Sequence, residues 1–194
     1  LYPLSLHDAL PIFVCSPNCS TIQLVVVLKP LLDAFGLKRV IVATYQSVSG
    51  TGKDAIDELT SQTEAVLSGK QVESRVYPRQ IAFNVLPHID CFLDGYSGEE
   101  WKIANETRKI LDRPELMITA TCVRVPVFVG HAEAVLVELE RRSSREQIIE
   151  TLSGAPSVNV FGEDEDYPVP IDSVGRDEVL VGRIRRDISS DNAF

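Results

Sequence analysis

The feature that most constrains this chain is the passage from a proline-restricted turn into an apolar helix at residues 16–23, Ser-Pro-Asn-Cys-Ser-Thr-Ile-Gln. Pro17 fixes its own φ and restricts the residue before it, so the approach is extended. Serine and threonine favour helix starts, and an apolar run follows them. We therefore expect a helix over residues 21–35, closed by Gly36.

Cys19 lies where this helix begins. It faces unpaired backbone N–H groups and the positive end of the helix dipole, which favour the nucleophilic thiolate. Asn18 beside it offers an amide N–H suited to a developing oxyanion. A single cysteine is more often a small buried apolar residue, so the rest of the chain must supply catalytic partners.

A buried strand is predicted at residues 38–46, with Gln46 at its polar end. The glycine-containing turn Ser-Val-Ser-Gly-Thr-Gly follows at residues 47–52 and leads into a helix at 53–67. Such a turn lets the backbone approach a phosphate or a cofactor ring, although a plain tight connection is its commoner use. It is neither a Walker loop nor a GxGxxG fingerprint.

Two extended segments are expected at residues 72–77 and 80–90. Ser97 and Glu100 then form a capping box, which predicts a helix to about Leu111.

Three charged residues of that helix, Glu99, Lys102 and Glu106, are three and four positions apart and share one face. They form either a solvated charged surface or, near the helix start, a pair that binds an ammonium group and an anion.

Arg124 stands in an apolar, β-prone run, where an unpaired guanidinium is unfavourable. Its partner is either a protein carboxylate or a ligand carboxylate. His131 follows Gly130 at a strand break, before a second strand at residues 134–139. A lone histidine is more often structural than catalytic.

Further along, Ser143 and Glu146 predict a capped helix to Leu152, and short strands are expected at residues 158–161 and 179–184. Because strands and hairpin-like pairs alternate with helices, we predict an α+β fold with a mixed, largely antiparallel sheet.

Composition narrows the class of protein. A chain of 194 residues with 44% hydrophobic content can bury one good core. A net charge of −9 disfavours nucleic-acid and anionic-membrane partners. Four cysteines without CxxC spacing and no secretory signal indicate reduced thiols in the cytoplasm and no metal site.

Residues 1–12 have no initiator Met, no basic region and no clear period, so they are not a signal peptide. They resemble translated sequencing-adapter read-through. We expect them to be a non-native leader outside the fold, with one domain over residues 13–194.

Several segments, in order, resemble the aspartate-β-semialdehyde dehydrogenase family over roughly residues 14–194. The first is the active-site segment Pro-Asn-Cys-Ser-Thr-Ile-Gln, although the family usually has Asn where this chain has Ser16. The others are Ala-Phe-Asn-Val-Leu-Pro-His-Ile-Asp at 82–90, the Glu-x-x-Lys of Glu99 and Lys102, Arg-Val-Pro-Val at 124–127 and Gly-His-Ala-Glu-Ala at 130–134.

The resemblance implies a fold like the C-terminal domain of the glyceraldehyde-3-phosphate dehydrogenase-like superfamily, with helices on one face of the sheet. It implies the catalytic and dimerisation domain of a cytoplasmic, NADP-dependent homo-oligomer, a dimer or a tetramer. The family's N-terminal NADP-binding domain and final helix are not found in this sequence, so we expect a fragment that is inactive alone.

The implied reaction is the reversible reductive dephosphorylation of L-4-aspartyl phosphate to aspartate semialdehyde, in lysine, threonine and methionine biosynthesis. By resemblance, Cys19 forms the thioester, His131 takes and returns the proton, Asn18 helps to stabilise the oxyanion and Gln46 orients the acyl group.

The remaining implied roles concern binding. Arg124 clamps the substrate carboxylate, Glu99 binds its amine and Lys102 supplies charge for phosphate, while Ser49 and Gly50 lie near the nicotinamide. Two alternatives stay open: an acyl-phosphate reductase resembling N-acetyl-glutamyl-phosphate reductase, and a non-catalytic domain that only dimerises.

Overall fold

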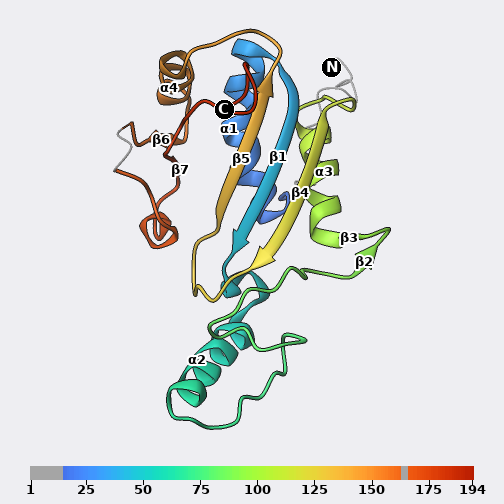
Figure 1. Ribbon diagram of the computed structural model, residues 1–194, viewed down its shortest axis with the longest axis vertical. Coiled ribbons are helices and arrows are strands. Elements are labelled where there is room, and N and C mark those ends of the chain that lie inside the picture. The colour runs from blue at the N-terminus through green and yellow to red at the C-terminus, as the bar shows by residue number, and fades with distance from the viewer. Residues whose placement is uncertain (1–14, 163–165) are drawn as a thin grey trace, which may run out of the picture.

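A computed structural model of the chain describes residues 15–162 and 166–194 (Figure 1). The expected leader at residues 1–12 lies outside the described residues. The helices are α1 (Cys19–Phe35), η2 (Val48–Thr51), α2 (Lys53–Leu67), α3 (Gly98–Ile110), α4 (Arg145–Ser153) and η3 (Pro170–Ser173). The strands are β1 (Leu37–Gln46), β2 (Phe92–Leu93), β3 (Tyr96–Ser97), β4 (Met117–Arg124), β5 (Ala132–Leu139), β6 (Val158–Val160) and β7 (Val179–Val181).

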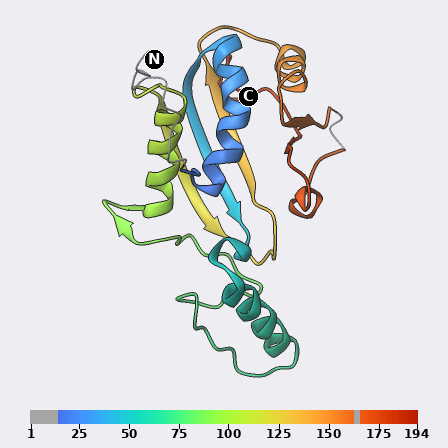
Figure 2. The same ribbon diagram turned by 180° about the vertical axis from the view of Figure 1, so that it is seen from behind.

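The centre of the fold is a sheet of order β4-β1-β5, in which β1 runs parallel to β4 and antiparallel to β5. Helices α1 and α3 cover one face of it (Figures 1 and 2). The predicted α+β class, with a mixed sheet and helices on one face, is confirmed. Antiparallel pairing is less dominant than expected. The β1–β5 and β2–β3 pairs are antiparallel, whereas the β1–β4 and β6–β7 pairs are parallel.

The helix that carries Cys19 is fixed to the sheet by one apolar stripe. Leu24, Leu28 and Leu31 recur at helical spacing and are buried, as are Val40 and Val42 of β1 in the same core cluster. α1 begins at Cys19 rather than at Thr21, because the Asn18 side chain caps it.

At its other end α1 closes at Gly36, whose φ of 72° suits glycine. The chain then turns back into β1, so the start of α1 and the end of β1 lie at the same end of the sheet (Figure 1).

Two local predictions are wrong. The segments at residues 72–77 and 80–90 form turns and coil, apart from an isolated bridge between Leu86 and Arg124, because side chains of α2 satisfy their N–H groups. Helix α4 is capped by Ser144 and Gln147, one residue beyond the predicted pair, since Ser144 rather than Ser143 accepts from the N3 backbone.

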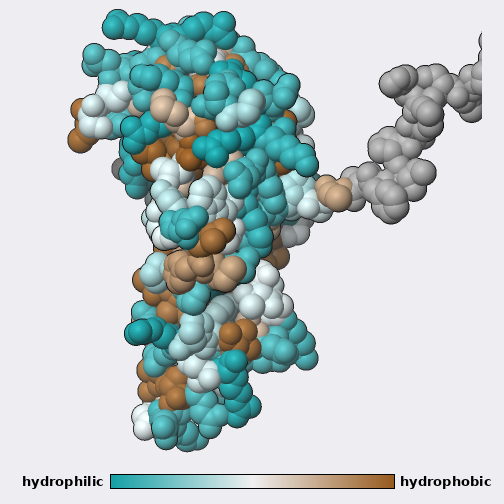
Figure 3. Space-filling view, turned by 90° about the vertical axis from the view of Figure 1, so that its right-hand side faces the viewer, coloured by the Kyte–Doolittle hydropathy of each residue, from teal (hydrophilic) through white to brown (hydrophobic). Residues whose placement is uncertain are grey.

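The β2–β3 hairpin projects from the α3 side of the molecule (Figure 1). Its side chains Phe92, Leu93 and Tyr96 are exposed, and the space-filling view of this side shows apolar residues gathered at mid-height (Figure 3).

The α2 unit is stabilised by one buried carboxylate. Glu58 is 7% exposed and accepts hydrogen bonds from the backbone N–H groups of Arg75, Val76 and Tyr77.

Replacing Glu58 with alanine leaves those donors without their acceptor, so we expect the free energy of unfolding to fall by about 3 kcal/mol in urea titrations. Glu64→Ala, an exposed change on the same helix, is the control. Equal losses in the two variants would refute this account of the loop.

Candidate active site

The first turn of α1 forms one wall of the candidate site. The Asn18 Oδ1 accepts hydrogen bonds from the N–H groups of Ser20 (3.0 Å) and Thr21 (3.2 Å), which satisfies two of the helix's free donors. Cys19 is thereby the first helical residue, and its side chain is open to solvent on one side.

Helix α3 holds Asn18 from the other side. Glu99 is 5% exposed, and its Oε1 accepts from Asn18 Nδ2 at 2.8 Å and from Gln46 Nε2 at 3.2 Å. Glu106, two turns further on, accepts the Asn18 backbone N–H at 2.8 Å. The spacing in the sequence correctly predicted that Glu106 shares a helix face with Glu99. No pattern among neighbouring residues indicated that Asn18 is its partner.

Lys102 lies at the solvent edge of the same helix face. Its Nζ is 2.9 Å from Asp90 and 3.9 Å from Glu99 Oε2, and its side chain is about half exposed. Lys102 thus lies beside Glu99, although Asp90 is its direct partner.

The His131 ring is held by Ser47, which sequence reasoning missed. The Ser47 N–H donates to His131 Nδ1 at 3.1 Å, and the Ser47 hydroxyl lies 3.0 Å from the same nitrogen. Because a backbone N–H can only donate, the neutral ring carries its hydrogen on Nε2. Ser49 continues the contact, with its hydroxyl 3.0 Å from that of Ser47. The only available signal was that Ser47 follows Gln46 at the strand end.

Arg124 is buried at the end of β4, where it pairs in register with Gln46. Its Nη1 donates to the Ser47 carbonyl at 2.8 Å, and its Nε has no hydrogen-bond partner among the described residues. Within residues 15–162 and 166–194 it forms no salt bridge with a carboxylate. Of the two partners that the sequence left open for Arg124, the described residues thus do not supply a protein carboxylate.

Gly50 keeps space beside these two residues. A Cβ at this position would lie 3.2 Å from His131 Nε2 and 3.3 Å from Arg124 Nη1, closer than side chains normally approach. The backbone of the η2 turn therefore approaches the ring and the guanidinium closely, and Gly50 leaves open the volume that a side chain would fill.

The electrostatics of Cys19 correct one expectation. Partial burial and the Glu99 carboxylate raise the pKa of the Cys19 thiol, against the lowering effects of the Ser20 N–H and hydroxyl and of Arg124. The predicted lowering of this pKa by the helix start is wrong for this chain, because burial and a neighbouring negative charge outweigh the helix N-terminus.

His131 is shifted toward its neutral form. Burial and the charge of Arg124 lower the pKa of His131, and Glu99 and the Gly130 carbonyl oppose them only in part. The site therefore holds a protonated thiol and a neutral imidazole, between a buried carboxylate and a buried guanidinium.

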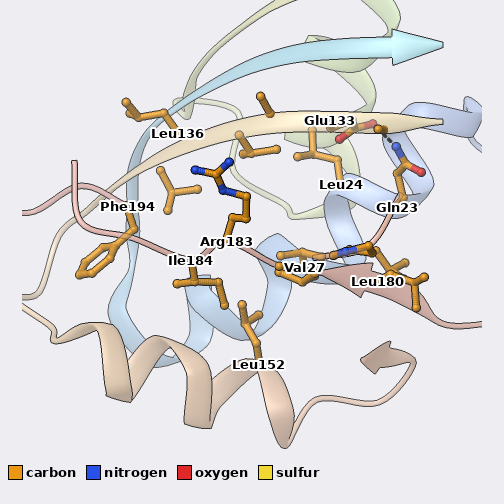
Figure 4. Close-up of a pocket in the computed structure, with 18 of the residues that line it drawn as sticks. Gln23, Leu24, Val27, Glu133, Leu136, Leu152, Leu180, Arg183, Ile184 and Phe194 are labelled. Atoms are coloured by element: carbon orange, nitrogen blue, oxygen red, sulfur yellow. Dashed lines mark hydrogen bonds between the residues drawn. The ribbon is translucent and has the colours of Figure 1, made fainter. Parts of the chain in front are cut away.

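A largely apolar hollow of about 900 Å³, with His131 among its lining residues, lies between α1, β5 and the segment around β7 (Figure 4). Cys19 is not among its lining residues. Across it Gln23 Nε2 donates to Glu133 Oε1 at 2.6 Å, and burial raises the pKa of Glu133 to about 7.

Two findings concern metal ions and membranes. Among the described residues no group of His, Cys, Asp or Glu side chains is arranged to hold a metal ion. None of the helices in that part of the chain has the length and apolarity to cross a bilayer.

The fold and site define an α+β domain that joins a cysteine at a helix start to a histidine, an arginine and a buried carboxylate. The family model for the semialdehyde dehydrogenase dimerisation domain matches residues 28–194, so the chain belongs to the semialdehyde dehydrogenase family. The resemblance noted in the sequence is confirmed.

Proteins that are similar to this chain and carry an enzyme name indicate a narrower class than the family model does. The chain is 52% identical over 178 residues to an aspartate-semialdehyde dehydrogenase from Aquifex aeolicus, covering 90% of this chain and 52% of the relative. The crystal structure of aspartate semialdehyde dehydrogenase II from Vibrio cholerae, complexed with ASA, is similar at 48% identity and a TM-score of 0.90, over 93% of this chain and 54% of that one.

A more distant structure, aspartate semialdehyde dehydrogenase with NADP from Candida albicans, is 28% identical with a TM-score of 0.66, over 93% of this chain and 50% of that one. The chain thus spans about half the length of the relatives it matches.

Glu133 generates a stability prediction. Its folded pKa of about 7 lies above the ordinary 4.5, so its protonated form is the one that folding favours. The folded chain should therefore lose up to about 3 kcal/mol of stability as the pH rises from 4.5 through 7. Glu133→Gln should match the wild type in acid and exceed it at pH 8, as measured by urea unfolding.

The control is Glu138→Gln on the same strand, which removes an exposed contact with Lys38. If the stability difference between wild type and Glu133→Gln does not change with pH, Glu133 titrates alike in the folded and unfolded chain and the argument is wrong.

Proposed function

We propose that this chain is the catalytic half of an NADP-dependent aspartate-semialdehyde dehydrogenase. It would interconvert L-4-aspartyl phosphate and aspartate semialdehyde through a thioester on Cys19. The observation that carries the proposal is that Asn18, Gln46, Glu99, Arg124 and His131, far apart in sequence, are linked by contacts around the first turn of α1. The names of the relatives support it.

Cys19 is the nucleophile in this proposal, and the first turn of α1 stabilises the oxyanion that its attack creates. One hydrogen of the Asn18 amide is engaged by Glu99. Its second hydrogen and the Cys19 N–H, a first-turn donor without an intrahelical partner, are the groups we assign to the oxyanion. Gln46 orients the acyl group from the end of β1.

His131 acts at the reacting oxygen: its resting neutral ring, with the hydrogen on Nε2, donates a hydrogen bond to the substrate oxygen. Ser47 positions the ring for this contact. Because the pKa of the Cys19 thiol is raised, the proton leaves the sulfur only as the C–S bond forms, and it ends on the aldehyde oxygen to give the thiohemiacetal.

Substrate binding uses both buried charges. Arg124 receives the substrate carboxylate, because its guanidinium lacks a protein carboxylate among the described residues. Glu99 receives the amine, and Lys102 the phosphate. A buried carboxylate here favours a free amino group over an N-acylated substrate, which favours this reaction over that of an N-acetyl-glutamyl-phosphate reductase.

Ser49 and Gly50 are the residues we assign to the nicotinamide end of NADP. Because Gly50 has no side chain, the backbone of this turn lies close to His131 and Arg124, which supports placing the nicotinamide near it. When bound, the cofactor supplies the hydride exchange between the aldehyde and acyl oxidation levels. The Candida albicans relative is described with NADP, which supports the same cofactor here.

We further infer a homo-oligomer, a dimer or a tetramer, that acts in the cytoplasm in the biosynthesis of lysine, threonine and methionine. The matched family model is that of a dimerisation domain. On the helix-free face of the sheet, Tyr45 and Met117 are exposed, and a partner subunit would cover them.

A chimera tests the reaction. Residues 15–194 replace the aligned segment of the Aquifex aeolicus relative, and turnover is followed as NADP reduction with aspartate semialdehyde and phosphate. We expect Cys19→Ala to abolish turnover, because no thioester can form. Cys91→Ala, at another exposed cysteine, is the control. Full activity with Cys19→Ala would refute the covalent mechanism.

The same chimera tests Arg124. Lysine keeps the charge but cannot reproduce a two-pronged contact, so Arg124→Lys should raise KM for the semialdehyde more than it lowers kcat. The loss of a charged hydrogen bond corresponds to a decrease in kcat/KM of roughly tenfold to a hundredfold. Arg142→Lys, at an exposed site, is the control. An unchanged KM would show that Arg124 serves the protein rather than the substrate.

A further inference from the structure

The two oxygens of the Glu99 carboxylate are used unequally. Oε1 accepts from both Asn18 and Gln46. Within the described part of the chain, Oε2 has one ion-pair partner, Lys102 at 3.9 Å, and that lysine is bonded to Asp90 at 2.9 Å. An ionised carboxylate has acceptor sites on both oxygens, so Oε2 has room for a further donor.

This carboxylate is also joined to the nucleophile by a short path. Its hydrogen bond goes to Asn18, the residue before Cys19, and at 5% exposure its charge is poorly screened by water. A second negative charge on the Cys19 sulfur is therefore unfavourable, because the cation that Glu99 has among the described residues, Lys102 at 3.9 Å, is bonded to Asp90 at the solvent edge.

Other charged or titratable groups surround the thiol. Arg124 on β4 and the Ser20 N–H and hydroxyl on α1 favour the thiolate, but burial and Glu99 outweigh them. His131, whose pKa is lowered, adds no fixed positive charge. Lys102 and Glu106 lie along the Glu99 face of α3, and Asp90 pairs with that lysine.

We propose that Glu99 acts as an electrostatic lock: its charge adds to the burial that disfavours ionisation of the Cys19 thiol, and a cationic group of the substrate that binds Oε2 weakens this effect. The nature of that cation, an amino acid's ammonium group, rests on the proposed function. A substrate with a free amine then makes Cys19 more reactive than a substrate without one, so Glu99 selects the substrate through reactivity as well as binding.

The pH dependence of Cys19 alkylation tests the lock on the 194-residue chain itself. Iodoacetamide modification is followed by peptide mass spectrometry, with thermal unfolding as the check on folding. Glu99→Gln keeps an oxygen acceptor for Asn18 but removes the charge. We expect the midpoint of its rate profile to fall by about one pH unit and its rate at pH 7 to rise about tenfold.

Glu106→Gln is the matched control, because it makes the same change on the same helix face and also contacts Asn18. Its midpoint should shift less than that of Glu99→Gln, since Glu99 is the charge that raises the pKa of Cys19 most, whereas Glu106 bonds the backbone N–H of Asn18. Equal midpoints in wild type and Glu99→Gln, or equal shifts in the two variants, would overturn the lock.

Release by a cation is tested with L-alaninamide and N-acetyl-L-alaninamide at pH 7, where most of the first carries a charged α-amino group and the second carries none. The wild type should be alkylated faster with the first amide, and Glu99→Gln equally fast with both. Equal wild-type rates would overturn the release step. Alkylation is measured without enzyme turnover. Its outcome can therefore be told apart from that of the Cys19→Ala test, which measures turnover.

Discussion

The rest of the site depends on the position of one residue, Asn18. Its side chain caps α1, and its own N–H groups are bound by two carboxylates of α3. The apolar stripe of α1 packs the helix against the sheet, but it does not fix the position of the first turn, which lies beyond the apolar core. The hydrogen bonds from Asn18 to Glu99 and Glu106 fix that position. The position of Cys19, the next residue, follows from them.

The polar end of the sheet shows how a buried network can prepare a binding site. Buried polar groups must find partners, and here Glu99, Gln46, Ser47 and Arg124 satisfy most of one another's needs. Among the described residues Arg124 Nε is buried without a hydrogen-bond partner, and Glu99 Oε2 has Lys102 at 3.9 Å. The network thus leaves one cationic and one anionic group incompletely bonded by the protein.

Cys19 shows why position alone does not decide reactivity. A helix N-terminus lowers a thiol pKa, yet partial burial and one nearby carboxylate reverse the sign. Partial burial and the charge of Glu99 favour the protonated thiol, and burial and the charge of Arg124 favour the neutral imidazole. Chemistry then depends on what binds to the two buried charges.

Local signals in the sequence determined the elements and the candidate residues. The capping box at Ser97, the closure at Gly36 and the strand that ends in Gln46 depend on neighbours in the chain, so they could be read without a structure. The partnerships could not be read. Ser47 meets His131 across 84 positions and Glu106 meets Asn18 across 88, and no local pattern encodes such pairs. The sign of the Cys19 pKa shift also belongs to the tertiary structure, because burial and the charge of Glu99 arise only when α3 packs beside α1.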